Sequence, residues 1–306
     1  SYSLSKRTRF RVSVFSQRGS YSIVLRVIPS RIPTVAELGL PEQLNQIADE
    51  RNGIVLVTGP TGSGKSTTLA AILKKMNQEK PIHIITIEDP IEYLHPADKA
   101  TINQREVGSD TKSLALALRA ALRQAPKVIL VGEMRDRETV EIGLSAAETG
   151  HLVLTTLHTV DAGQTINRIL GMFNIEEEKQ IRIRLSETVR WVVSQRLIPK
   201  VGGGRIAAFE IMASNLRVQD SILQGEAEGK TFYDIMQAGQ HAGMTTFDDY
   251  LVGLYEQGLI TQENALAYAS RKGVAGRGID SVKHARGEAT TDIESLHMDR
   301  NYDKTI

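Results

Sequence analysis

The 306-residue chain has no cysteine, so disulfide bonds and thiolate metal sites are excluded. Its seven histidines form no spaced cluster of ligands. The chain also lacks any apolar run near the roughly 18 to 20 residues that a membrane-spanning helix needs, and its opening resembles no signal peptide. These absences favour a cytoplasmic protein whose membrane contact is at most peripheral.

Acidic residues are absent before Glu37, although the net charge of the whole chain is only +1. This small net charge gives no general argument for a nucleic-acid partner. In the opening stretch arginine alternates with apolar residues in "RFRVSVF" and "YSIVLRVIP", and "QRGS" between them has turn composition, so we predict a β-hairpin. Its arginine-bearing face is either a solvated strand face or a functional surface. The pattern starts without an initiator methionine, which favours a chain that begins further upstream.

Proline marks the first boundary that we predict along the chain. The stretch "PSRIPTVAE" carries two prolines, and Thr34 to Glu37 has the spacing of a helix capping box. We interpret residues 1–28 as the first domain and residues 29–36 as a linker. A helix that ends near Gly53 is expected to follow.

The central part of the chain, residues 37–213, alternates strand and helix patterns. The strand patterns are "GIVLVTG", "HIITI", "VILV", "HLVLTTLH" and "GRIAAFEIM". Such alternation is typical of an α/β fold with a mostly parallel sheet covered by helices. Residues 214–272 show only helical periodicity and predict a helical C-terminal subdomain. Residues 273–306 have few large apolar side chains, so we expect disorder there.

A phosphate-binding loop is the clearest motif. The segment "GPTGSGKST" fits the pattern G-x-x-x-x-G-K-[S/T], and it lies between a strand and a helix, which is the context that identifies such a loop. Glycines allow positive φ and bring amide groups close to phosphate oxygens at a helix N-terminus. Lys65 is predicted to contact the β and γ phosphates of ATP, and Ser66 to ligate Mg²⁺. The predicted nucleotide contacts are Gly59, Pro60, Thr61, Gly62, Ser63, Gly64, Lys65, Ser66 and Thr67.

Other motifs decide among the many classes of phosphate-loop protein. The strand "VILV" ends at Gly132, where a nucleotide-hydrolysing fold would be expected to place an acid. The chain also contains "TIEDPIEYLH", "NQREVG", "LVGEMRD" and "AAETGHLVLTTLHT". Together these motifs resemble the secretion ATPases of type IV pili and type II secretion. The similarity is greatest to the pilus retraction ATPases of the PilT family, over residues 9–212 and more loosely to about 271.

This resemblance implies a fold and a set of acidic site residues. It implies a RecA-like core, preceded by part of a small PAS-like α+β domain and followed by a helical region. Glu133, next to Gly132, would take the magnesium-proximal role through water, and Glu92 would be the general base that orients and deprotonates the attacking water. Glu88 and Asp89 would support the magnesium shell. Carboxylates at adjacent strand ends suit phosphoryl transfer, which needs positioned water and compensated charge.

The resemblance also gives roles to histidines and arginines. His151 and His158 would form the family's histidine box, with His158 as a sensor of the γ-phosphate. Without the resemblance, both would be read as strand-end residues with satisfied hydrogen bonds. Arg9, Arg11 and Arg26 would reach a nucleotide held by an adjoining subunit, which implies a homohexameric ring.

Two stretches depart from the retraction pattern. The family carries a C-terminal motif close to Ala-Ile-Arg-Asn-Leu-Ile-Arg-Glu, whereas the corresponding helix here reads "LRVQDSILQGE", with Gln219, Asp220 and Ser221 at characteristic places. Before "VILV" the family usually has "DPD", but this chain has the sequence "APK" at residues 125–127.

The favoured hypothesis is a magnesium-dependent hexameric ATPase that drives type IV pilus retraction and twitching motility. It would work at the cytoplasmic face of the inner membrane with a pilus platform protein. Extension and type II secretion ATPases are the runner-up, but they usually carry a four-cysteine zinc insertion that this chain cannot build. Type IV secretion motors, a regulator that binds ATP without turnover, and a nucleic-acid translocase are further alternatives.

Overall fold

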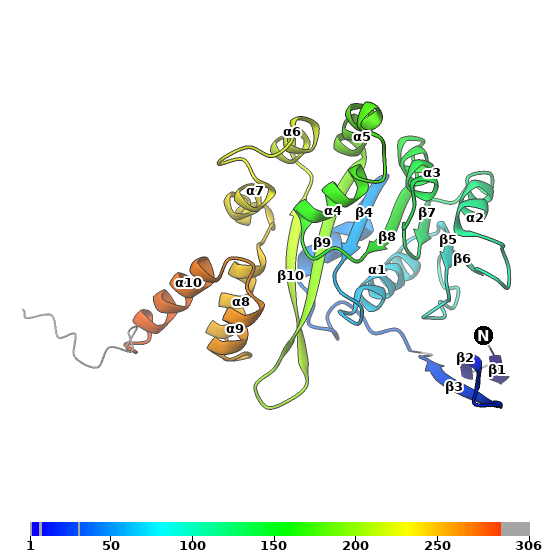
Figure 1. Ribbon diagram of the computed structural model, residues 1–306, viewed down its shortest axis with the longest axis horizontal. Coiled ribbons are helices and arrows are strands. Elements are labelled where there is room, and N and C mark those ends of the chain that lie inside the picture. Colours follow the sequence, from blue (N-terminus) through cyan, green and yellow to red (C-terminus); the bar gives the residue numbers. More distant parts are fainter. Residues whose placement is uncertain (1, 6–7, 30, 289–306) are drawn as a thin grey trace, which may run out of the picture. The chain divides into compact units, whose positions relative to one another are not determined.

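The computed structural model describes residues 2–5, 8–29 and 31–288 of the chain. The chain divides into two compact units (Figure 1). The first unit comprises Ser1–Leu197 and Ala207–Thr246, and the second comprises Ile198–Ile206 and Phe247–Ile306. The helical subdomain that we predicted for residues 214–272 therefore spans both units.

The first unit begins with a three-stranded antiparallel sheet in the order β1-β2-β3. Strand β2 (Thr8–Gln17) pairs with β3 (Ser20–Ile28), and β1 (Tyr2–Ser5) pairs with the outer edge of β2. Arg18 and Gly19 connect β2 and β3 with φ values of 48° and 76°. Two consecutive residues with positive φ are typical of the tight turns that match the twist of a hairpin. The predicted hairpin is confirmed, and its assignment to a PAS-like domain stays a prediction.

The segment after the hairpin contains the predicted capping pair without the predicted helix. The Thr34 amide donates to Glu37 Oε2 at 2.8 Å, and the Glu37 amide donates to Thr34 Oγ1 at 3.1 Å. These bonds close a turn and do not start a helix. The reason is that Gly39 adopts a φ of 62° and Pro41 follows, and both residues interrupt a helix. The next helical element is the 3₁₀ helix η1 (Glu42–Asp49).

A seven-stranded sheet forms the centre of the first unit, and β4 to β9 pair with one another in parallel. The predicted α/β class and all five predicted strands are confirmed. In spatial order the strands are β10 (Arg205–Ala213), β9 (Val189–Pro199), β4 (Gly53–Thr58), β8 (Leu152–Leu157), β7 (Val128–Val131), β5 (His83–Glu88) and β6 (Thr101–Glu106).

Two of these strands, β6 and β9, were not predicted. Strand β6 lies at the edge of the sheet and reads "TINQRE", so its side chains are too polar to give a clear apolar pattern. Strand β9 begins at Val189, directly after the helix that ends at Thr188. No glycine or proline separates the two elements, and turn residues are the usual signal of a boundary.

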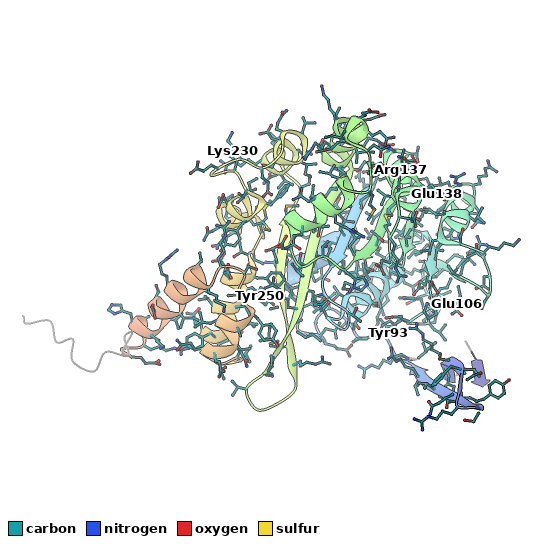
Figure 2. All side chains as sticks on the ribbon, in the orientation of Figure 1. Tyr93, Glu106, Arg137, Glu138, Lys230 and Tyr250 are labelled. Atoms are coloured by element: carbon teal, nitrogen blue, oxygen red, sulfur yellow. The ribbon has the colours of Figure 1, made fainter. Side chains whose placement is uncertain are left out.

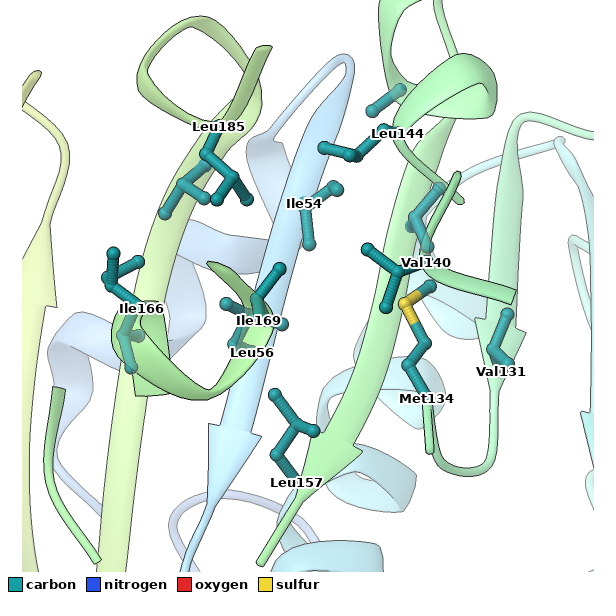
Figure 3. Close-up of a cluster of buried hydrophobic side chains, with 14 of the residues drawn as sticks. Ile54, Leu56, Val131, Met134, Val140, Leu144, Leu157, Ile166, Ile169 and Leu185 are labelled. Carbon is teal, nitrogen blue, oxygen red and sulfur yellow. The ribbon is translucent and has the colours of Figure 1, made fainter. Parts of the chain in front are cut away.

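Helices cover both faces of the large sheet in the first unit. Ile54 and Leu56 of β4 join the buried cluster that packs against α3, α4 and α5 (Figure 3). Val55 and Val57 alternate with them and face the side of α1 and η1. The helices of this unit are α1 (Lys65–Glu79), α2 (Leu114–Ala121), α3 (Arg137–Glu148), α4 (Ala162–Leu170), α5 (Ile175–Thr188), α6 (Leu216–Gln224), α7 (Phe232–Ala238) and the short η2 (Gln240–Ala242).

The second unit contains α8 (Phe247–Glu256), α9 (Gln262–Tyr268) and α10 (Lys272–Ala285). Helix α10 corrects our expectation of disorder from residue 273. Its buried residues are Ala275 and Ile279, and it packs against α8. Residues 289–306, the rest of the predicted disordered tail, lie outside the described part. None of the helices in the described ranges is long and apolar enough to cross a membrane.

Candidate active site

The phosphate loop connects β4, in the middle of the large sheet, to helix α1. Gly59, Gly62 and Gly64 have φ values of 141°, 78° and 96°, which confirms the backbone freedom expected of them. A Cβ on Gly59 would lie 2.3 Å from the carbonyl oxygen of Gln195. The loop thus passes so close to β9 that glycine is required there. The amide groups at the start of α1 remain directed toward the loop, as in sites for anions at helix N-termini.

Lys65 is the first residue of α1 and is buried. Its Nζ donates to the carbonyl oxygens of Gly59 at 2.8 Å and Pro60 at 3.1 Å, and it lies 3.5 Å from His158 Nδ1. Burial lowers the pKa of Lys65, while the charges of Glu133 and Glu92 act in the opposite direction. The ammonium group is therefore held among carbonyl oxygens and a neighbouring imidazole at the position where phosphate oxygens would provide stronger partners.

The segment after β7 presents Glu133 to the same site. The Gly132 amide donates to the carbonyl oxygen of Ile87 at 2.8 Å, and the Gly132 carbonyl accepts from Thr156 Oγ1 at 2.6 Å. These bonds fix the backbone next to the acid. Glu133 Oε2 lies 3.1 Å from His158 Nε2 and 2.8 Å from Arg135 Nη2.

The Glu133 carboxylate is mostly covered, with its side chain 17% exposed, whereas its two partners reach solvent. The hydrogen bond to Glu133, followed by the charge of that carboxylate, raises the pKa of Arg135. A row of groups results: Lys65, then His158, then Glu133, then Arg135. It crosses the carboxyl ends of β4, β8 and β7, which are neighbours in the sheet.

The end of β5 supplies two more acids. Glu88 Oε1 accepts from Thr86 Oγ1 at 2.7 Å and from Gln104 Nε2 at 3.2 Å, and Glu88 Oε2 accepts from the Glu92 amide at 3.4 Å. Burial raises the pKa of Glu88. Glu92 and Asp89, in contrast, are exposed to the cavity described below. Glu92 can thus meet a water molecule, while Glu88 is held by the protein.

A cavity of about 580 Å³ brings most of the predicted residues together. The phosphate loop, the acids at the ends of β5 and β7, and His158 after β8 all line it. Arginines of the N-terminal hairpin line it as well, in the same chain. The predicted site residues on its wall are Arg11, Arg26, Thr61, Gly62, Gly64, Lys65, Ser66, Thr67, Glu88, Asp89, Glu92, Glu133 and His158.

Some predicted residues are not on this wall. His151 lies at the amino end of β8, where its Nδ1 is 3.0 Å from the carbonyl oxygen of Ala146. The six residues of β8 span about 20 Å, so in this chain His151 lies far from the phosphate loop, and its predicted contact with the nucleotide stays a prediction. Gly59, Pro60 and Ser63 belong to the phosphate loop but do not line the cavity. The backbone of Arg9 lies in β2, and its side chain is outside the described part.

The sequence analysis missed four residues at this site. Tyr93, His95 and Arg135 line the cavity, and all three lie inside motifs that we had quoted without giving these residues a role. Gln195 accepts from Thr68 Oγ1 at 2.8 Å and contacts the phosphate loop from β9. Gln195 lies more than a hundred positions from the phosphate loop along the chain, so no local sequence pattern indicates this contact. Figure 2 labels Tyr93 and Glu106. Tyr93 belongs to the segment whose Ile91 amide donates to Glu106 Oε2.

The residues at the loop fit a nucleoside triphosphate with Mg²⁺. Ser63 Oγ is buried and has no hydrogen-bond partner, which leaves an unsatisfied polar atom inside the phosphate loop. In the described part of the chain, no group of three or more histidine, cysteine, aspartate or glutamate residues could hold a metal ion. In phosphoryl-transfer sites, Mg²⁺ takes one or two protein ligands together with phosphates and water. Ser66 lines the cavity at the loop.

Comparison with known proteins gives a consistent result. Residues 2–249 match the family model described as "Type II/IV secretion system protein". The chain is 50% identical over 257 residues to the type IV pilus retraction ATPase PilT of Pseudomonas aeruginosa, covering 84% of this chain and 74% of that protein. It is 47% identical over 266 residues to a twitching motility protein of Neisseria gonorrhoeae, covering 87% of this chain and 71% of that protein.

The fold agrees with this similarity. The crystal structure of the pilus retraction motor PilT with bound ADP superimposes with a TM-score of 0.79 at 49% identity. The superposition covers 86% of this chain and 74% of that chain. The similarity thus extends beyond the phosphate-loop domain to most of this chain.

Proposed function

The chain belongs to the family of type II/IV secretion system proteins, and on that premise we propose that it is a magnesium-dependent ATPase that drives type IV pilus retraction. Support comes from the relatives, which are named for pilus retraction and twitching motility. It also comes from the ADP-bound retraction motor whose fold this chain shares. The RecA-like α/β core provides the frame for this chemistry.

One observation carries the proposal: Lys65, His158 and Glu133 stand in a row beside the phosphate loop. The Lys65 ammonium is 3.5 Å from one ring nitrogen of His158, and the other ring nitrogen is 3.1 Å from the Glu133 carboxylate. Phosphoryl transfer is catalysed chiefly by positioning and by compensation of charge. A cation, an imidazole and an acid in this order provide both.

In the proposed reaction, Lys65 leaves the carbonyl oxygens of Gly59 and Pro60 and binds the β and γ phosphates. Glu92 orients a water molecule and accepts its proton as that water attacks the γ-phosphorus. The bond from the γ-phosphorus to the β–γ bridging oxygen breaks, and ADP leaves. Ser66 would hold Mg²⁺ directly, and Glu133 would hold it through water. The bound metal neutralises charge that develops on the phosphate oxygens. Glu88 and Asp89 support the water shell of the metal.

His158 is suited to report the state of the γ-phosphate. A neutral imidazole donates from one ring nitrogen and accepts at the other. His158 contacts Lys65 on one side and Glu133 on the other, so a change at either group alters its hydrogen bonds. It follows β8 directly, and this strand would transmit such a change.

We further propose that the protein works as a homohexamer at the cytoplasmic face of the inner membrane, together with a pilus platform protein. In a ring, hydrolysis that changes the angle between rigid parts of each protomer becomes mechanical work. Mass photometry with and without ATP would measure the assembly. A chain that stays monomeric at full ATPase rate would contradict the ring.

Steady-state phosphate release tests the chemistry. Glu92→Gln should lower the turnover of ATP at least about a hundredfold, because it removes the general base. Lys65→Ala should abolish turnover by removing the phosphate contact. Lys75→Ala is the matched control. Lys75 lies on the same helix but does not line the cavity, and its Nζ lies 2.6 Å from Glu79 Oε1. Full activity in Glu92→Gln would exclude the proposed base.

A deletion strain separates retraction from the other motors of the family. Loss of a retraction ATPase should leave pili on the surface and stop twitching, whereas loss of an extension ATPase should remove the pili. Unchanged pili and unchanged twitching would favour a secretion motor. Absence of phosphate release by the purified chain would favour the regulator that binds ATP without turnover.

A further inference from the structure

The segment that carries Glu92, Asp89–His95, is anchored to the sheet by its backbone. The Ile91 amide donates to Glu106 Oε2 at 3.3 Å. Gln104 of β6 binds the segment twice, because its Nε2 donates to the Tyr93 carbonyl at 2.9 Å and its Oε1 accepts from the His95 amide at 2.8 Å. These bonds tie the segment to β6 at the edge of the sheet.

The same segment must also be aligned with the phosphate loop, which leaves a different strand. In the sheet, β8 and β7 lie between β4, which leads into the loop, and β5, which leads into the Glu92 segment. Anchors on β6 therefore fix Glu92 relative to the loop only through several strands. Positioning errors of about 1 Å can cost a hundredfold in rate, so a direct link between the two segments would matter.

Tyr93 makes such a link. Its hydroxyl lies 2.8 Å from Thr67 Oγ1, and either oxygen can be the donor. Thr67 stands in the first turn of α1, next to Ser66 and two residues after Lys65. Both partners line the cavity. The bond joins Tyr93, the residue after Glu92, to Thr67, the residue after Ser66. Both side chains are uncharged.

We propose that Tyr93 is a positioning residue whose hydroxyl aligns Glu92 with the phosphate loop. This role rests on the proposed function, in which Glu92 acts as the general base. The hydroxyl touches neither the reacting phosphorus nor the attacking water; it acts through the Glu92 segment. Its loss should therefore lower the rate of the chemical step and leave nucleotide binding intact.

Tyr93→Phe tests the role with one atom removed and the ring kept. We expect kcat for ATP to fall about three- to tenfold, which corresponds to the net value of one neutral hydrogen bond. The KM for ATP and the affinity for ADP should stay unchanged. Tyr21→Phe is the matched control, because Tyr21 is 82% exposed on β3, and it should leave kcat unchanged.

A double-mutant cycle with Thr67→Val shows whether the effect belongs to this bond. Tyr93→Phe should lower kcat when position 67 is threonine or serine and should have little further effect when it is valine. An equal fall in kcat in the valine background would overturn the proposal. So would wild-type kcat in Tyr93→Phe, a rise in KM at unchanged kcat, or loss of ADP binding, which would indicate a role in holding the fold. If the unmodified chain releases no phosphate, the proposed function fails first and this role fails with it.

Discussion

His95 lies in the wall of the cavity with an unusual ring environment. Its Nδ1 is buried and has no hydrogen-bond partner, while its amide is held by Gln104. Burial lowers the pKa of His95 to about 4. An imidazole in such a place stays neutral well below the pH at which an exposed histidine takes up a proton. Folding therefore opposes protonation of this ring.

The first prediction concerns the pH dependence of stability. The pKa of His95 is about 6.5, the ordinary value for histidine, in the unfolded chain and about 4 in the folded chain, so between these values the unfolded state binds more protons. Stability then falls as the pH falls through this window. From pH 7 to pH 5 the free energy of unfolding should drop by about 2 kcal/mol more in the unmodified chain than in His95→Gln.

Urea denaturation at both pH values measures this difference, and other titrating groups cancel in the comparison. The predicted change requires that the ring stay buried in solution. Parallel loss of stability in the two proteins would show that His95 is solvated and titrates normally.

At the site, the residues that could be predicted from the sequence were those that lie after the end of a buried strand. Lys65, Glu133 and His158 each follow a buried strand of a parallel sheet, and the carboxyl ends of such strands meet at one edge. His151 precedes its strand, so it lies at the opposite edge of the sheet, and its predicted role stays untested. Gln195 could not be found, because its contact with the phosphate loop depends on the position of β9, which has no local signature.

At the scale of elements, apolar periodicity located the buried strands and missed those that depend on their neighbours. Strand β4 is buried throughout and easily recognised, whereas β6 is a polar edge strand. Helix α10 was missed for another reason. It contains Gly273, Gly276 and Gly278, which suggested a flexible chain, but glycine also permits close packing of helices.

The second prediction follows from the packing of α10. A Cβ on Gly278 would lie 2.7 Å from Val252 Cγ2 on α8, so one of the two helices must shift. Gly273, in the same helix, has nothing closer than 3.9 Å. Gly278→Ala should therefore lower the free energy of unfolding by about 1 to 3 kcal/mol. Gly273→Ala should raise it by up to about 1 kcal/mol through helix propensity.

Thermal unfolding followed by circular dichroism tests this pair. The two variants have the same composition, so opposite shifts of the melting temperature isolate the contact with Val252. Equal stabilisation by both alanines would mean that α10 does not pack against α8 in solution.

At the scale of the whole molecule, the cavity combines residues from the N-terminal hairpin and from the large sheet. Arg11 and Arg26 line it together with Lys65, and all three belong to one chain. The resemblance to the pilus ATPases implied that such arginines serve a nucleotide held by an adjoining subunit. Because Arg11 and Arg26 line the cavity of this chain, we expect them to serve the nucleotide of their own protomer.

The third prediction separates these two arrangements in the proposed ring. Arg11→Ala with Arg26→Ala should lower kcat at least about tenfold, because charge on the transition state loses cations. We expect this double variant to bind nucleotide still, and Lys65→Ala to lose nucleotide binding while it keeps both arginines. When the two are mixed in one ring, arginines that act within a protomer cannot restore any site. Phosphate release by the mixture should therefore equal the sum of its components. Affinity pull-down with differently tagged chains establishes that subunits have mixed, and a rise of activity above the sum would mean that the arginines act between subunits.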